Sequence, residues 1–120
     1  MSPRDCIVIV EPNDLIRELL ERWLDDAGYQ VVTVAKNHAM PVVMPQLVVT
    51  DISEPGTGGN TIEVLLATYA APILALSARF RRGLGGSSEP AQRLHVRKVL
   101  PKPFTRQQLL RAVRDCLKGS

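Results

Sequence analysis

The sequence predicts an α/β domain in which one parallel sheet carries helices on both faces. Five short apolar runs, rich in β-branched residues, alternate along the chain with segments of helical period or with loops. The runs lack polar alternation, which is typical of strands buried on both faces of a parallel sheet. Parallel neighbours need crossover connections, and right-handed crossovers place helices on both faces.

Length and composition fit a single domain spanning residues 1–120. Hydrophobic residues make up 45% of the 120 residues and charged residues 22%, which excludes a disordered chain. Two cysteines, Cys6 and Cys116, are too few for a disulfide scaffold and indicate a reducing, cytoplasmic setting. No uncharged stretch reaches the roughly 20 residues of a membrane span, so we expect no membrane contact.

The first strand and helix are the clearest elements. Residues 6–10 form the first apolar run, and Asn13 or Asp14 can cap the helix that follows. Apolar residues then recur at helical spacing through 15–27, with charged residues on the opposite side. Gly28 is well placed to end this helix in a left-handed conformation.

The remaining elements are shorter. Further strands are predicted at 29–34, 46–50, 72–76 and 97–100, and helices at 61–69 and after a capping box formed by Thr105 and Gln108. Prolines limit any helix within 36–45 to a short or distorted one. The glycine-rich segment 79–94 argues against a long regular helix.

Charge is divided unevenly along the chain. Residues 1–78 contain 4 basic and 10 acidic residues, net −6, whereas residues 79–120 contain 11 basic and 2 acidic residues, net +9. This division indicates either two surfaces with different partners or a solvated asymmetry without a partner. The basic part has no interleaved aromatics and no readable helix-turn-helix, so we expect no direct nucleic-acid binding.

Polar residues follow the predicted strands at their carboxyl ends, where sites of open parallel sheets lie. Glu11 ends the first strand, Asp51 the third and Ser77 the fourth, and Lys102 follows the fifth. Crowded carboxylates favour a cation such as Mg²⁺, while a hydroxyl and a lysine can hold phosphoryl oxygens. The set therefore suits phosphoryl transfer to a carboxylate.

These residues, in the order Glu11, Asp51, Ser77 and Lys102-Pro103-Phe104 and with their flanking apolar runs, carry a family resemblance. The chain resembles, over nearly its whole length, the receiver domain of two-component response regulators. The resemblance implies a flavodoxin-like, or CheY-like, sheet of five strands in the order 2-1-3-4-5. It also implies a bacterial signalling phosphoprotein that is a phosphorelay module and not an enzyme.

The resemblance assigns a role to each site residue. Asp51 would be the phosphoacceptor, supplied by a phosphohistidine on a sensor histidine kinase or a phosphotransfer protein. Glu11, Asp51 and the backbone carbonyl of Ser53 would bind Mg²⁺. Ser77 would bind a phosphoryl oxygen and Lys102 would pair with the phosphoryl group. A cis peptide often precedes the proline at position 103.

Two departures from the family pattern bear on function. Receivers usually have two adjacent acidic residues after the first strand, but here Pro12 follows Glu11, so one metal ligand is missing. We therefore expect weak Mg²⁺ binding and slow or absent phosphorylation. The family's switch aromatic corresponds to Val99, through which the usual aromatic rotation cannot run.

A partner-binding face is also implied, because receivers use their fourth helix, fifth strand and fifth helix for dimer or output contacts. Basic residues would lie on or near this face, and they suit a homodimer or an acidic protein partner: Arg97, Lys98, Arg106, Arg111 and Arg114.

Two alternatives remain open at this stage. A degenerate pseudo-receiver would bind partners without phosphorylation, and Pro12 and Val99 favour it. A small flavodoxin-like enzyme or nucleotide binder would retain a chromophore or nucleotide. The loop at 56–61 lacks the lysine of a phosphate-binding loop, which disfavours nucleotide binding.

Overall fold

The computed structural model describes residues 5–34, 43–51, 64–77 and 96–118. Five parallel strands form one sheet in the order β2-β1-β3-β4-β5. This order confirms the predicted fold class and topology. The strands are β1 (Cys6–Val10), β2 (Gln30–Val34), β3 (Leu47–Asp51), β4 (Ile73–Ser77) and β5 (Lys98–Pro101).

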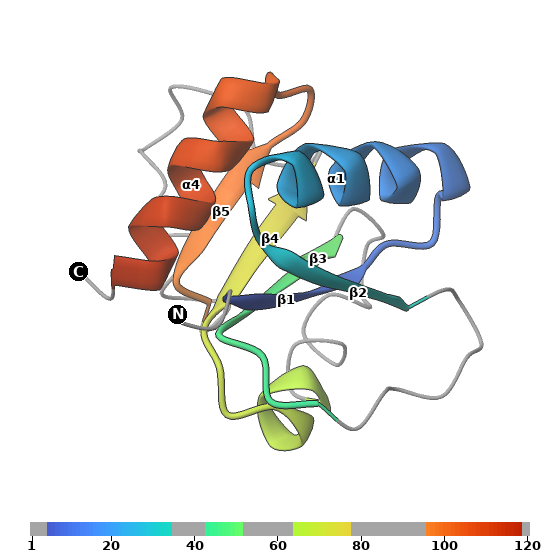
Figure 1. Ribbon diagram of the computed structural model, residues 1–120. Coiled ribbons are helices and arrows are strands. Elements are labelled where there is room, and N and C mark those ends of the chain that lie inside the picture. The colour runs from blue at the N-terminus through green and yellow to red at the C-terminus, as the bar shows by residue number, and fades with distance from the viewer. Residues whose placement is uncertain (1–4, 35–42, 52–63, 78–95, 119–120) are drawn as a thin grey trace.

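Helices cover both faces of the sheet. Helices α1 (Asp14–Asp26) and α4 (Arg106–Lys118) lie side by side on one face, and a helical segment at 64–68 lies on the other (Figure 1). No helix in the described parts of the chain is long and apolar enough to cross a membrane. The doubtful segments 36–42 and 79–94 lie outside the described residues, as does the start of the helix predicted at 61–69.

Alternating side chains of each strand supply two separate cores, as the pleat of a doubly covered sheet requires. In β1, Ile7 and Ile9 point to the core under α1 and α4, whereas Val8 points to the core under residues 64–68. All three are fully buried. The uninterrupted apolar runs of the sequence are thus explained by burial on both faces.

Each end of helix α1 has the capping residue that the sequence predicts. The Asn13 side chain accepts a hydrogen bond of 3.0 Å from the backbone N–H of Ile16, which satisfies one free donor of the first turn. Gly28 has φ +98°, a conformation that costs glycine little and other residues more. Of the two predicted capping residues, Asn13 is therefore the cap, and Asp14 is the first helical residue.

Helix α4 begins with the predicted capping box. The backbone N–H of Gln108 donates to Thr105 Oγ1 over 3.1 Å, and the backbone N–H of Thr105 donates to Gln108 Oε1 over 2.9 Å. The apolar face of the helix buries Leu109, Val113 and Cys116. Burial raises the pKa of the Cys116 thiol to about 11, so this cysteine is an unreactive core residue.

The later strands lie one residue further along the chain than predicted. β3 extends through Asp51 and β4 through Ser77, whereas the sequence pattern placed both residues just after their strands. The difference arises because hydrophobic patterning marks the buried part of a strand, while backbone pairing continues into the polar residue that follows. Both side chains are thus held by the sheet itself.

Candidate functional site

The carboxyl edge of the sheet brings distant parts of the chain together. Glu11 follows β1 directly, Asp51 ends the neighbouring strand β3, and Lys102 follows β5. Strand register aligns these ends, with Val10 beside Thr50, Asp51 beside Leu76, and Ser77 beside Pro101. The site is therefore positioned by the paired strands of the sheet.

Lys102 joins the two carboxylates. Its Nζ lies 2.7 Å from Asp51 Oδ1 and 3.2 Å from Glu11 Oε1, so one ammonium donates hydrogen bonds to both acids. The three residues are separated by 40 to 91 positions in sequence, and only the fold brings them together. The predicted convergence of Glu11, Asp51 and Lys102 is confirmed as geometry.

The cluster is shielded from water. The side chain of Glu11 is 2% exposed, that of Asp51 9% and that of Lys102 17%. Burial alone would lower the pKa of Lys102, but the hydrogen bond and charge of Asp51, together with the charge and hydrogen bond of Glu11, raise the pKa of Lys102 above its ordinary value. Lys102 therefore remains an ammonium at neutral pH.

Backbone and helix groups fix the position of Glu11. The backbone N–H of Asn13 donates to Glu11 Oε2 over 3.1 Å, and the Arg17 guanidinium donates to the Glu11 carbonyl over 2.9 Å. Arg17 also forms an ion pair with Asp14. Sequence reasoning missed both anchors of Glu11, although a basic residue in the first turn of the helix was visible beside the strand end.

Ser77 lies at the same edge and is fully buried. Its carbonyl accepts a hydrogen bond of 3.0 Å from the backbone N–H of Lys102, which ties the segment after β5 to β4. The Lys102–Pro103 peptide is cis, as the resemblance implied. Ser53, the third residue implied as a metal ligand, lies outside the described residues.

The donor set suits a divalent cation poorly. Both carboxylates already bind the Lys102 ammonium, and Pro12 offers no side-chain oxygen. Within the described ranges, no group of three or more metal-ligating side chains is present. A Mg²⁺ ion prefers several oxygen ligands, of which one or two are carboxylates. Lys102 would have to release Glu11 or Asp51 before that carboxylate could bind the ion. Weak Mg²⁺ binding therefore stays a prediction. The ion pairs that Lys102 forms with Glu11 and Asp51 support it.

The implied switch and partner residues lie just before β5, within β5 and on α4. Val99 is buried in β5, in the core opposite α1 and α4. The Arg97 guanidinium donates to the carbonyl of Cys116 over 2.9 Å, and Lys98 forms a half-exposed ion pair of 3.3 Å with Asp115. The other residues of the implied partner face are exposed on α4: Arg106, Arg111 and Arg114.

A shallow apolar groove adjoins the site. It has a volume of about 420 Å³ and runs between α1 and the segment that follows β5. Trp23 and Phe104 meet edge-to-face in it, with ring centroids 6.4 Å apart. Lys102 and Pro103 also line the groove, so whatever occupies it would lie beside the ion-paired cluster.

Several solved structures that are similar to this chain are receiver domains. The receiver domain of the putative response regulator NarL from Mycobacterium tuberculosis is 24% identical, with a TM-score of 0.76 over 98% of this chain and all of that one. The HemR receiver domain from Leptospira biflexa is 26% identical, with a TM-score of 0.72 over 95% and 94% of the two chains.

A third similar structure is the receiver domain of a modulated diguanylate cyclase from Desulfovibrio desulfuricans, which is 23% identical, with a TM-score of 0.76 over 98% of this chain and 96% of that one. No protein-family model matches the sequence. The chain thus has the receiver-domain fold, and the implied CheY-like architecture is confirmed.

Proposed function

We propose that this receiver-fold domain is a phosphorelay module whose Asp51 accepts a phosphoryl group. The donor would be a phosphohistidine on a sensor histidine kinase or a phosphotransfer protein. The domain would be a cytoplasmic signalling unit and not an enzyme acting on a metabolite. The single observation that carries the proposal is the 2.7 Å contact between Lys102 Nζ and Asp51 Oδ1.

The chemistry follows from this contact. An oxygen of the Asp51 carboxylate would attack phosphorus as the bond between phosphorus and the imidazole nitrogen breaks, and the imidazole leaves with the electron pair. Asp51 then carries an acyl phosphate with two negative charges. The Lys102 ammonium would move its hydrogen bonds from the carboxylate to a phosphoryl oxygen, since charge-assisted bonds to phosphate are strong.

Glu11 would limit this exchange. Its carboxylate binds the same ammonium at 3.2 Å and is held in place by the N–H of Asn13. An added phosphoryl group therefore competes with Glu11 for Lys102, and the like charges of the two groups repel. Since Pro12 supplies no further acid to recruit a metal, the reaction is expected to be slower than in receivers that have both acids.

Reaction with acetyl phosphate tests the proposal. The wild-type chain, incubated with about 20 mM acetyl phosphate and Mg²⁺ well above typical receiver affinities, is expected to gain one phosphoryl group by intact mass. Asp51→Asn should show no adduct, because an amide oxygen is a poor nucleophile. An adduct that persists in Asp51→Asn, or a wild-type chain that stays unmodified at every Mg²⁺ concentration, would refute the proposal.

A second candidate is a pseudo-receiver that binds partners without phosphorylation. The observation in its favour is that the Lys102 ammonium already donates hydrogen bonds to both acids of the site and offsets part of their charge. Absence of an adduct in the acetyl phosphate experiment, with partner binding unchanged in Asp51→Asn, would establish this alternative.

A further inference from the structure

Strand β2 forms an open edge of the sheet. Within the described residues it pairs only with β1, and the strand order places it at one end of the sheet. In a parallel pair, both polar backbone groups of a residue point to the same side of the strand, and this side alternates from residue to residue. The backbone N–H of Gln30 donates to the carbonyl of Asp5 over 2.9 Å, so Gln30 faces β1. The N–H and C=O groups of Val31 and Thr33 therefore point outward, away from β1.

This edge lacks the features that usually keep another strand from pairing with an edge. Edge strands are commonly protected by lysine, by proline or by a bulge. The five residues of β2 include no lysine and no proline, and their register with β1 is unbroken over five residue pairs. Residues 31–33 are also partly exposed. In the described part of the chain, the outward groups of β2 thus form a template for one added strand.

A shallow hollow lies beside this edge, on the face of the sheet that α1 covers. It has a volume of about 650 Å³ and is lined by Val31 and by charged residues of α1. The Val31 side chain packs on the core under α1 and α4, whereas that of Val32 packs on the opposite core. Side chains of a strand added to β2 would alternate in the same way, so every second one would point toward α1 and the hollow.

The hollow is acidic. Its lining from α1 comprises four acidic residues and one basic residue, net −3, and all five are exposed: Glu18, Glu21, Arg22, Asp25 and Asp26. None of them forms an ion pair with another described residue. The hollow therefore attracts cations.

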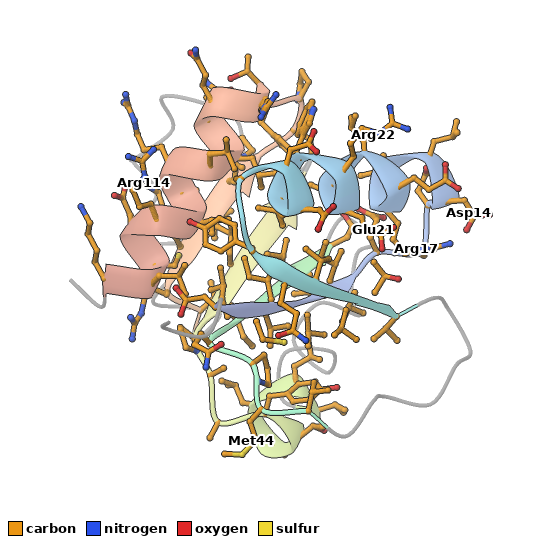
Figure 2. All side chains as sticks on the ribbon, viewed as in Figure 1. Asp14, Arg17, Glu21, Arg22, Met44 and Arg114 are labelled. Carbon is orange, nitrogen blue, oxygen red and sulfur yellow. The ribbon has the colours of Figure 1, made fainter. Side chains whose placement is uncertain are left out.

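Arg22 offsets only part of this charge. It lies four residues after Glu18 and four before Asp26, the spacing at which side chains of a helix are neighbours. Figure 2 shows Arg22 on the upper side of α1 and Glu21 on the lower side, where β2 lies. Asp25 follows Glu21 by one turn and lies on the same side of the helix. Two carboxylates thus lie closest to the open edge, away from the one arginine.

We propose that the edge of β2 binds an extended basic segment of a partner protein as an added strand. Backbone groups of the segment would form hydrogen bonds with the outward N–H and C=O groups of Val31 and Thr33. Lysine or arginine at every second position of the segment would lie next to Glu21 and Asp25. Main-chain pairing supplies affinity in this mode of recognition, and the alternate side chains supply specificity.

Charge selects a basic partner over a second copy of this chain. Two copies that paired their β2 edges about a twofold axis would be antiparallel, and their hollows would lie next to each other on one face of the joined sheet. Each hollow carries net −3, and like charges brought together across an interface are unfavourable. An acidic extended segment would meet the same repulsion.

Binding of a fluorescein-labelled peptide to the unphosphorylated full chain without Mg²⁺ tests the proposal. The probe alternates lysine with valine over about seven residues, and a peptide that alternates glutamate with valine is the charge control. In fluorescence anisotropy at about 50 mM salt, the lysine peptide should bind at least about tenfold more tightly than the glutamate peptide. Its dissociation constant should rise at least about tenfold at about 500 mM salt, because salt screens exposed charges.

Amide hydrogen exchange distinguishes strand addition from adsorption of the peptide on the acidic helix. The N–H groups of Val31 and Thr33 should exchange at least about tenfold more slowly in the saturated complex, since each gains a hydrogen-bond acceptor. The N–H of Val32 faces β1, and its exchange rate should change little. Binding without slower exchange at Val31 and Thr33 would overturn the proposal.

Variants test the edge and the acids separately. Thr33→Pro removes an outward donor but no hydrogen bond to β1, so the chain should stay folded and bind the lysine peptide at least about tenfold more weakly. Glu21→Gln combined with Asp25→Asn should weaken binding at least about tenfold and leaves the backbone unchanged. Arg22→Gln should strengthen binding, and Arg114→Gln on α4 is the matched control that should not alter it. Circular dichroism verifies that each variant is folded.

Equal affinity for the lysine and glutamate peptides would overturn the proposal, as would unchanged binding in folded Thr33→Pro or in the variant without the two acids. Self-association of the wild type that Thr33→Pro abolishes would assign the edge to a second copy and refute a basic partner. Because the experiments contain no phosphoryl donor and no Mg²⁺, their failure would leave phosphorylation of Asp51 untouched.

Discussion

Replacement of Lys102 by methionine is expected to lower the free energy of unfolding at pH 7 by about 3 kcal/mol, because loss of one member of a buried ion pair leaves its partner charge uncompensated. The carboxylates of Glu11 and Asp51 are only 2% and 9% exposed, and both would lose their cation. Urea denaturation followed by Trp23 fluorescence measures the change.

Lys98→Met is the matched control for this variant. Lys98 also pairs with a carboxylate, that of Asp115 at 3.3 Å, but the two side chains are 32% and 48% exposed. Water screens such a pair, so its loss should cost no more than about 1 kcal/mol. Equal losses of unfolding free energy in Lys98→Met and Lys102→Met would contradict this account. They would show that the cluster of the two acids and Lys102 is no better shielded from water than the surface pair.

The stabilisation by Lys102 should depend on pH in a defined direction. Its pKa is raised in the folded chain, so its contribution is complete below the ordinary pKa of 10.5 and is lost as pH rises through the raised value. The difference in stability between wild type and Lys102→Met should therefore be constant at neutral pH and narrow above about pH 10.5.

Replacement of Pro12 by aspartate is expected to strengthen Mg²⁺ binding by at least about tenfold, since an added carboxylate increases the ligand charge of the site. Pro12 is exposed next to Glu11, at the position where the family resemblance places a metal-binding acid. Phosphorylation of Asp51 by acetyl phosphate should accelerate in parallel. Isothermal titration with Mg²⁺ and the rate of adduct formation by intact mass measure the two effects.

Pro12→Ala is the control that separates the effect of the added carboxylate from the effect of losing proline. This control removes the restriction on φ but adds no oxygen, so its Mg²⁺ affinity should match that of the wild type. Tight Mg²⁺ binding by the wild type, or equal gains in Pro12→Ala and Pro12→Asp, would contradict the view that the missing acid limits the site.

Most of the fold could be predicted because the clearest pattern in the sequence, its apolar runs, reflects hydrophobic burial. Hydrophobic burial is the dominant favourable contribution to folding. The unbroken apolar runs specify strands buried on two faces, and the observed cores under α1 and α4 and under residues 64–68 use alternate residues of the same strands. Capping residues such as Asn13 and Thr105 act through local hydrogen bonds, which short patterns reveal well.

Contacts between distant side chains were less predictable. The convergence of Glu11, Asp51 and Lys102 followed from strand order, but the sharing of one ammonium by both acids depends on side-chain geometry. The anchoring of Glu11 by Arg17 and the apolar groove between α1 and the segment after β5 also needed coordinates. Sequence periodicity assigns a residue to one side of a helix, yet it does not show which neighbour that side meets.

The proposed function depends on the direct ion pair between Lys102 and Asp51 at the carboxyl edge of the sheet. A double-mutant cycle with Lys102→Met, Asp51→Asn and the double variant measures this interaction in urea denaturation. The contact of 2.7 Å and the low exposure of both groups predict a coupling free energy of about 2 kcal/mol. A coupling free energy below about 0.5 kcal/mol, with all variants folded, would contradict a direct ion pair between the two side chains.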